Sequence, residues 1–327
     1  ITSVNGGIAG VDAIAGGWIA GTWGYRPIFW TMAVIGIAST ILVGIFADES
    51  VAEGSQNERM DWLGVIFLVV AVGTALTAVN SMQHIAEVNW MFVGILLAIA
   101  LAAFVTFWAV ERKSSHPLSP VHYLKQRRTW GLLLTTLLSL TGVFAIMNGV
   151  VPAIAQDSEC GAGVSASISS FFTLTPYAII GLIFGPIAGI LATKFGYLKV
   201  LRCGLGISVA AAAIGTFVVH TPTVAGLLGL SLLLGISYAG TVNIMLNGLG
   251  VVLSPKDNTG YLTGFNAGAF NLGAGISYTV LYGVMDAFSQ SNGTSAGYVA
   301  SMIGGAVVLL LALGCSFLIP RPETLND

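Results

Sequence analysis

Long apolar runs recur along the whole chain and restrict its fold more than any other feature. Each run is about 20 residues long, which is the length that a helix needs to cross a ~30 Å hydrocarbon core. Charged residues make up 8% of the chain and the mean hydropathy is +0.88, whereas soluble domains carry roughly 25% charged residues. The alternating polarity of outer-membrane strands is not seen. The sequence therefore predicts an all-α integral membrane protein.

We expect about ten transmembrane helices, joined by short connections that contain Gly or Pro. The expected spans are 2–21, 27–47, 62–82, 90–110, 130–152, 165–192, 198–219, 223–252, 259–286 and 298–319. Lys and Arg are concentrated in alternate connections, whereas the opposite connections hold Arg26 and no other Lys or Arg. Because basic loops stay in the cytoplasm, this asymmetry predicts a multi-pass protein of the plasma or inner membrane with a cytoplasmic C-terminus.

Asp12 is the ionisable residue near the middle of a span. A carboxylate at that depth costs about 2.5–3.5 kcal/mol, so it should face protein or a wet cavity. Asp12 is therefore a candidate for proton coupling, although a carboxylate that bonds a neighbouring helix and never titrates fits the same position. Asn5 lies on the same stripe and is a candidate for a substrate cavity. Small residues allow helices to approach closely, which makes Gly10, Gly16 and Gly17 candidates for helix packing.

Asparagines and tyrosines supply further polar groups inside the spans. The candidates for a substrate cavity are Tyr177, Asn243, Asn247, Asn271, Tyr278 and Tyr282. Asn271, Tyr278 and Tyr282 fall on one stripe of the span 259–286. Asn243 and Asn247 lie one turn apart in the span before it. Such side chains either bond across helices or meet a substrate, so both roles stay open.

Two prolines, Pro176 and Pro186, lie inside the span 165–192 and predict a broken or kinked helix. Broken helices are common where transporters move, although kinked helices also occur in proteins that do not move. Gly185, Pro186 and Gly189 are therefore candidates for helix packing or gating.

Motifs of several kinds of chemistry are missing from the sequence. It has no Walker A loop, no HEXXH and no GxSxG elbow. Its four histidines lie in or beside loops with no Cys or Asp cluster around them. We therefore expect no enzyme activity, no metal site, no cofactor and no nucleic-acid partner.

Several short motifs follow one another in the order found in a known family. They are Gly16–Trp18, Gly24–Phe29, Asp61–Gly64, the basic stretch from Glu111 to Arg128, and Gly185–Gly189 followed by Lys194–Gly196. With this ordered series, the chain resembles the fourteen-helix, drug:proton antiporter branch of the major facilitator superfamily.

The resemblance implies two six-helix halves with two inserted helices between them, and about four helices before residue 1. The expected divisions are 1–47 for the last two helices of the N-terminal half, 48–61 for a cytoplasmic linker, 62–110 for the inserted helices, 111–129 for a basic cytoplasmic linker, and 130–327 for the C-terminal half and tail.

The function implied by the resemblance is that of a monomeric secondary active transporter. It would export amphipathic or cationic small molecules across the lipid bilayer in exchange for protons, by alternating access. An alternative is a metabolite or nutrient carrier of the same fold, either a symporter or a uniporter, since Asp12 and Ala13 stand where the family has Gly-Pro. A third reading is a receptor or assembly subunit that transports nothing. The absence of Arg and Lys from the spans favours neutral or cationic cargo.

Overall fold

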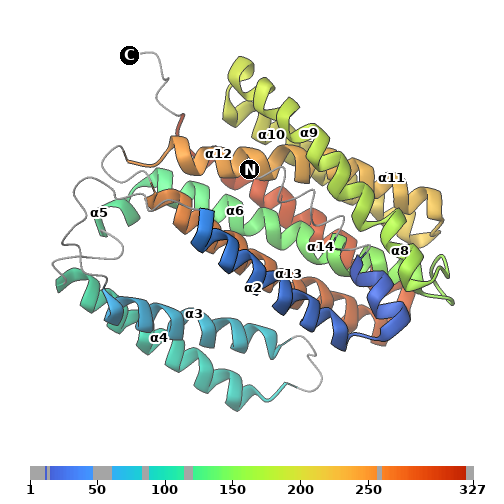
Figure 1. Ribbon diagram of the computed structural model, residues 1–327, viewed down its shortest axis with the longest axis horizontal. Coiled ribbons are helices and arrows are strands. Elements are labelled where there is room, and N and C mark those ends of the chain that lie inside the picture. Colours follow the sequence, from blue (N-terminus) through green and yellow to red (C-terminus); the bar gives the residue numbers. More distant parts are fainter. Residues whose placement is uncertain are drawn as a thin grey trace.

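The computed structural model describes residues 12, 15–46, 61–82, 88–113, 121–255 and 260–321. Within these residues the regular structure is entirely helical. The long helices run side by side as a bundle (Figure 1). The prediction of an all-α membrane fold is confirmed.

The helices follow the order of the expected spans. Their bounds are α2 (Arg26–Phe46), α3 (Trp62–Asn80), α4 (Trp90–Lys113), α5 (Val121–Leu124), α6 (Arg127–Ala145), η2 (Ile146–Val150), α7 (Val151–Gln156), α8 (Ala166–Phe172), α9 (Leu174–Phe195), α10 (Tyr197–His220), α11 (Val224–Leu234), η3 (Gly235–Val242), α12 (Asn243–Val252), α13 (Tyr261–Asn292), α14 (Thr294–Cys315) and η4 (Ser316–Leu318). Residues 15–23 are also helical. In the described part of the chain, eight spans are long and apolar enough to cross a membrane.

The main body of the bundle consists of two successive groups of spans. In the first group α6–η2–α7 is followed by α8–α9 and α10, and in the second α11–η3–α12 is followed by α13 and α14. The first span of each group is interrupted by a π-helix, η2 or η3. Such interruptions are rare and frequently occur at functional sites.

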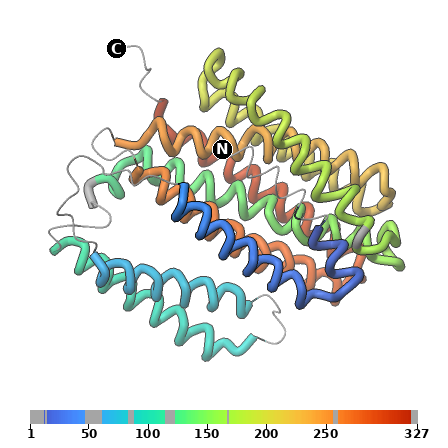
Figure 2. Tube along the Cα trace, viewed as in Figure 1, coloured from blue at the N-terminus to red at the C-terminus, as the bar shows by residue number. Residues whose placement is uncertain are grey.

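The helices α3 and α4 form a hairpin along one side of this body, drawn in cyan in Figure 2. Helix α3 contacts α13, since a Cβ atom on Gly275 would lie 3.4 Å from Leu76 Cδ2. Helix α3 begins at a cap, because the Asp61 side chain accepts a hydrogen bond from the backbone N–H of Gly64, at 2.9 Å. Helix α2 has no buried residue among those described, so its apolar side chains face outward all round. That surface suits a helix in contact with hydrocarbon.

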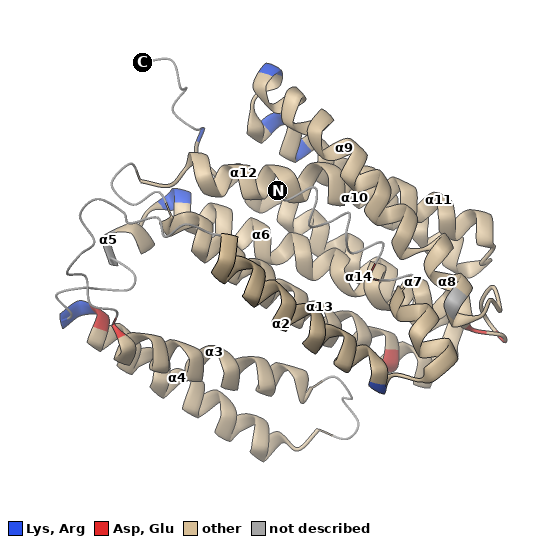
Figure 3. Cartoon of the chain, in the orientation of Figure 1, with Lys and Arg blue, Asp and Glu red and all other residues tan. Residues whose placement is uncertain are grey.

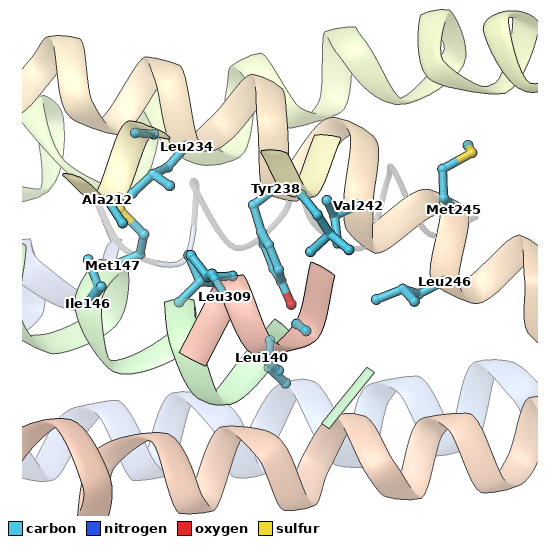
Figure 4. Packing of buried hydrophobic residues seen from close by; sticks show 14 of the residues in the cluster. Leu140, Ile146, Met147, Ala212, Leu234, Tyr238, Val242, Met245, Leu246 and Leu309 are labelled. Atoms are coloured by element: carbon cyan, nitrogen blue, oxygen red, sulfur yellow. The ribbon is translucent and has the colours of Figure 1, made fainter. Parts of the chain in front are cut away.

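The core lies between α6, η2, α10, η3 and α14. Figure 4 shows Tyr238 of η3 close to Leu140 of α6 and Leu309 of α14, and the Tyr238 side chain is 2% exposed. Small residues bring α6 and α14 together, since a Cβ atom on Gly142 would lie 3.0 Å from the carbonyl oxygen of Gly305. Close approach through glycine is the usual way in which membrane helices gain packing contacts.

The expected break in the span 165–192 is present at Thr173, which separates α8 from α9 with φ −117° and ψ −88°. Pro176 follows in the first turn of α9, where its missing N–H breaks no helical hydrogen bond. Pro186 lies inside α9 without ending it and is exposed. The break is therefore associated with Pro176 and not with Pro186.

Charge is distributed unevenly between the two ends of the bundle. Figure 3 shows most Lys and Arg at the end from which the C-terminus leaves. Arg112 and Lys113 are in the last turn of α4, and Arg127 begins α6. The Arg127 Nε atom donates to the Leu318 carbonyl at 3.0 Å, and Arg202 Nη2 donates to the Ser316 carbonyl at 3.2 Å. These bonds tie the segment after α14 to two other helices, through Arg127 of α6 and Arg202 of α10.

Candidate functional site

Three aromatic side chains of α6 and α13 meet on one face of the bundle. The ring centroids of Phe144 and Tyr278 are 5.8 Å apart with the planes at 87°, and those of Tyr278 and Tyr282 are 5.7 Å apart at 43°. All three side chains are half-buried. Aromatic pairs of this kind stabilise each other by about 0.5–1.5 kcal/mol. We call this fixed, partly accessible surface the aromatic patch (Phe144, Tyr278 and Tyr282).

The π-helix η2 begins beside this patch, and a serine of α13 explains why. The Ser277 hydroxyl accepts a hydrogen bond from the backbone N–H of Ala145 at 2.8 Å and donates one to the Thr141 carbonyl at 2.7 Å. In an α-helix that N–H would bond to that carbonyl directly. The hydroxyl is therefore inserted into the hydrogen-bond ladder of α6, which is a known cause of helix distortion.

The π-helix places two residues at the edge of the patch. Asn148 is exposed, and its side-chain Nδ2 donates to the Phe144 carbonyl at 3.0 Å. Gly149 lies against the hydroxyl-bearing edge of Tyr282, since a Cβ atom there would meet the Tyr282 hydroxyl oxygen and lie 2.9 Å from Cε2 and 3.0 Å from Cζ. A side chain at position 149 would therefore displace Tyr282.

A cavity of about 740 Å³ lies between α3, α6 and α13. Its wall consists of Leu68, Val72, Leu76, Trp130, Leu133, Leu134, Leu137, Gly260, Tyr261, Gly264, Phe265, Gly268, Ala269, Asn271 and Leu272. Most of these side chains are apolar, so the cavity alone has few groups that could recognise a polar solute. The aromatic patch begins at Tyr278, which is about 10 Å further along α13 at 1.5 Å per residue.

The asparagines of α13 have different roles in the structure. Asn271 is exposed in the cavity wall, and its Nδ2 donates to the Ala267 carbonyl at 2.8 Å. Asn266 is 2% exposed and connects two neighbours, accepting from the Thr136 hydroxyl at 2.6 Å and donating to the Leu246 carbonyl at 3.3 Å. Asn271 therefore remains a cavity candidate, whereas Asn266 holds helices together.

The other polar candidates lie away from the patch. Asn243 and Asn247 are half-buried in α12, where Asn247 Nδ2 donates to the Asn243 Oδ1 at 2.9 Å. The backbone of Tyr177 in α9 packs against Gly235, since a Cβ atom on that glycine would lie 2.7 Å from the Tyr177 carbonyl oxygen. The hydrogen bond between the two asparagines occupies part of their capacity to bind a solute.

The packing and gating candidates of α9 are only partly in close contact. Gly185 is buried, whereas Gly189 has no atom within 4 Å of where its Cβ atom would be. The contact between α9 and η3 runs through Gly181 and Gly240, where a Cβ atom would lie 2.7 Å from Ala239 and 2.6 Å from Phe184, respectively.

The candidates in the first span are described only in part. Asp12 is helical and exposed. Gly16 and Gly17 are half-buried, and nothing lies within 4 Å of a Cβ atom on Gly16. Asn5 and Gly10 lie outside the described residues. A proton-coupling role for Asp12 stays a prediction.

An acidic residue ties the loop after α7 to α14. The Asp157 carboxylate accepts from the backbone N–H groups of Cys160 and Glu159 at 3.0 and 2.9 Å, and from the Tyr298 hydroxyl at 3.0 Å. The backbone bonds, that from Cys160 first, lower the pKa of Asp157 from its usual 3.8. Among the described residues, no three His, Cys, Asp or Glu side chains are placed to hold a metal ion.

Sequence reasoning missed three residues of this site: Phe144, Asn148 and Ser277. Phe144 and Asn148 are four residues apart in an apolar span, so helical spacing alone could have placed them on one face. No comparable signal distinguishes Ser277, because its partners are 132 and 136 residues away in the chain.

The eight long apolar spans of the described residues are those of a multi-pass membrane protein. The sequence matches the Major Facilitator Superfamily over residues 1–278 and again over 162–326. The chain therefore belongs to the major facilitator superfamily, a family of transporters and not of enzymes.

Several curated proteins are similar to this chain. The uridine/deoxyuridine transporter of Lactococcus lactis is 50% identical over 325 residues, which is 98% of this chain and 67% of that protein. The multidrug transporter protein MdtP of Bacillus subtilis is 30% identical over 55% of this chain and 32% of its own length. The multidrug resistance protein Stp of Mycobacterium tuberculosis is 23% identical over 84% of this chain and 49% of its own length. The chain thus spans two thirds or less of these relatives.

These comparisons correct one expectation from the sequence. The family is confirmed, but the expected export of amphipathic or cationic drugs in exchange for protons is wrong. The relative that is 50% identical to this chain over the aligned residues is a uridine/deoxyuridine transporter, and the multidrug relatives are only distantly similar. The motifs on which that expectation rested lie at helix junctions and in loops, and none of them belongs to the aromatic patch.

Proposed function

We propose that this protein transports pyrimidine nucleosides, with uridine and deoxyuridine as its substrates. The observation that carries the proposal is the 50% identity to the Lactococcus lactis uridine/deoxyuridine transporter over 98% of this chain. The aligned region covers nearly the whole chain, 325 residues in all. The proposal agrees with the metabolite-carrier alternative that the sequence left open.

The chemistry of the aromatic patch supports a nucleoside as the cargo. A nucleoside is neutral at pH 7, and the patch of Phe144, Tyr278 and Tyr282 contains no Asp, Glu, Lys, Arg or His. A base stacked on an aromatic side chain gains about 1–3 kcal/mol. The tyrosine hydroxyls and the Asn148 amide add hydrogen-bonding groups at the edge of the stacked rings.

A carrier for both uridine and deoxyuridine cannot depend on the ribose 2′-hydroxyl. Recognition must then fall mainly on the base and on the part of the sugar that both nucleosides share. An aromatic surface with an amide at its edge meets this requirement, because it binds the base by its face and by its hydrogen-bonding edge.

The test is uptake of radiolabelled uridine by cells that lack nucleoside carriers and produce the full-length protein. We expect saturable uptake that excess deoxyuridine suppresses and that a lipophilic cation such as ethidium leaves unchanged. Cells that produce an equal amount of a Tyr278→Ala variant provide the site control, since loss of the central ring should weaken uptake. If the protein is present in the membrane but uridine uptake equals that of cells with the empty vector, the proposed function is refuted.

A further inference from the structure

The Asn148 amide is exposed but is held in one orientation. Its Nδ2 donates to the Phe144 carbonyl at 3.0 Å. Turning the amide over would place its own oxygen against that carbonyl, and two acceptors in that position repel each other. The bond therefore determines which way the amide oxygen and nitrogen point.

The locked amide has one N–H and one carbonyl oxygen left for a ligand. An asparagine side chain offers two N–H donors and one oxygen acceptor, and the described residues use one donor, in the bond to Phe144. Gly149, the next residue, lies against the hydroxyl-bearing edge of Tyr282 of the aromatic patch. The free donor and acceptor are thus adjacent to a surface on which a planar ring can stack.

Uracil and cytosine differ along the edge that such an amide would meet. Uracil presents an N–H group between two carbonyl oxygens. A neighbouring amide can therefore accept from that N–H and donate to the carbonyl oxygen on either side of it, whichever way round the base approaches. Cytosine presents an amino group, then a ring nitrogen acceptor and a carbonyl oxygen, so it can pair in only one sense. An amide that turns freely would pair with either base in both approaches, whereas a locked amide pairs with uracil in both approaches and with cytosine in only one of them.

We propose that Asn148 selects uracil over cytosine, through the single orientation in which the Phe144 carbonyl holds its amide. The inference deepens the proposed nucleoside transport and rests on it. The π-helix η2 contributes by carrying Asn148 and Gly149 at the edge of the patch. Asn148 is in this sense a specificity residue, while the aromatic rings supply binding that any pyrimidine can use.

The test compares uridine and cytidine as competitors of radiolabelled uridine uptake by the full-length protein. We expect cytidine to compete at least tenfold less well than uridine in the wild type. In Asn148→Ala we expect this preference to fall by roughly tenfold, because one bidentate pair discriminates between bases by about 1–3 kcal/mol. Asn148→Asp keeps the shape but has no N–H donor, and should lose the preference as well.

Gln156→Ala is the matched control. Gln156 is an exposed amide of the same span, and its Nε2 donates to the Pro152 carbonyl at 3.0 Å, also four residues back. This variant should keep both the uptake rate and the preference for uridine. An Asn148 variant that is present in the membrane can be too slow for an uptake assay. In that case we would purify it and measure how strongly uridine and cytidine each raise its unfolding temperature, which gives its preference between the two nucleosides.

The outcomes separate this inference from the proposed function. If the wild type transports uridine and both Asn148 variants keep its preference over cytidine, the inference is overturned and the proposed function stands. If the wild type transports no uridine, the proposed function fails, and the role of Asn148 falls with it. Loss of preference in both variants, with Gln156→Ala unchanged, supports the inference.

Discussion

Ser277 provides a direct test of how the site is built. The Ser277→Ala variant removes a hydroxyl that is 0% exposed and makes hydrogen bonds of 2.8 Å with the Ala145 N–H and 2.7 Å with the Thr141 carbonyl. A net hydrogen bond contributes about 0.5–1.5 kcal/mol, so losing both should destabilise the protein by roughly 1–3 kcal/mol.

The backbone has one way to recover part of this loss. Without the hydroxyl, the Ala145 N–H can bond directly to the Thr141 carbonyl, as in a regular α-helix. Removing the π-turn shifts the residues that follow by one position, which is about 100° around the helix axis. Asn148 would then turn away from the aromatic patch. Either the stability or the position of Asn148 must change, and we expect uridine uptake to fall in both cases.

The assay combines thermal unfolding of the purified full-length protein with initial rates of uridine uptake. Ser231→Ala is the control, because Ser231 is also 0% exposed but its hydroxyl has no hydrogen-bond partner among the described residues. That variant should be as stable as the wild type or slightly more so. If Ser277→Ala unfolds at the wild-type temperature and transports uridine at the wild-type rate, the inserted hydroxyl does not determine the site.

Three further variants test separate parts of the structure. In Gly149→Ala the added Cβ atom meets the ring of Tyr282 at 2.9–3.0 Å, so we expect a loss of about 1–3 kcal/mol in stability and weaker uridine uptake. Gly206→Ala is the control, because nothing lies within 4 Å of its added Cβ atom. This control should be neutral or stabilising in the same unfolding assay. Asp157→Asn should lower the unfolding temperature. Because the pKa of Asp157 is lowered from 3.8, the contribution of its carboxylate to stability is present above pH 3.8 and is lost only as the pH falls through the lowered pKa. A difference in unfolding temperature from wild type that varies between pH 5 and pH 8 would contradict this assignment. Asp12→Asn tests the prediction that Asp12 couples transport to protons. If the prediction holds, this variant abolishes uridine-driven proton flux in vesicles. Proton flux equal to that of the wild type would leave Asp12 with a structural role.

The helical membrane fold could be predicted from the sequence because its cause is local. A run of about 20 apolar residues must form a helix in hydrocarbon, where every backbone polar group needs a partner within the segment. The start of α3 at Asp61 could also be read directly, since a cap depends on residues three apart. The stripe of Asn271, Tyr278 and Tyr282 followed from helical spacing alone.

The site itself depends on contacts between helices that are distant in the sequence. Ser277 reaches α6 across 132 residues and opens its hydrogen-bond ladder, and no local pattern in α6 encodes this event. The tertiary structure also separated asparagines that look alike in the sequence. Asn247 bonds to Asn243 within α12, whereas Asn148 lies exposed beside the aromatic patch. Hydropathy thus determined which segments are helices, while the packing of α13 against α6 decided which polar side chains meet, because a buried hydrogen bond depends on atoms brought within about 3 Å by the fold.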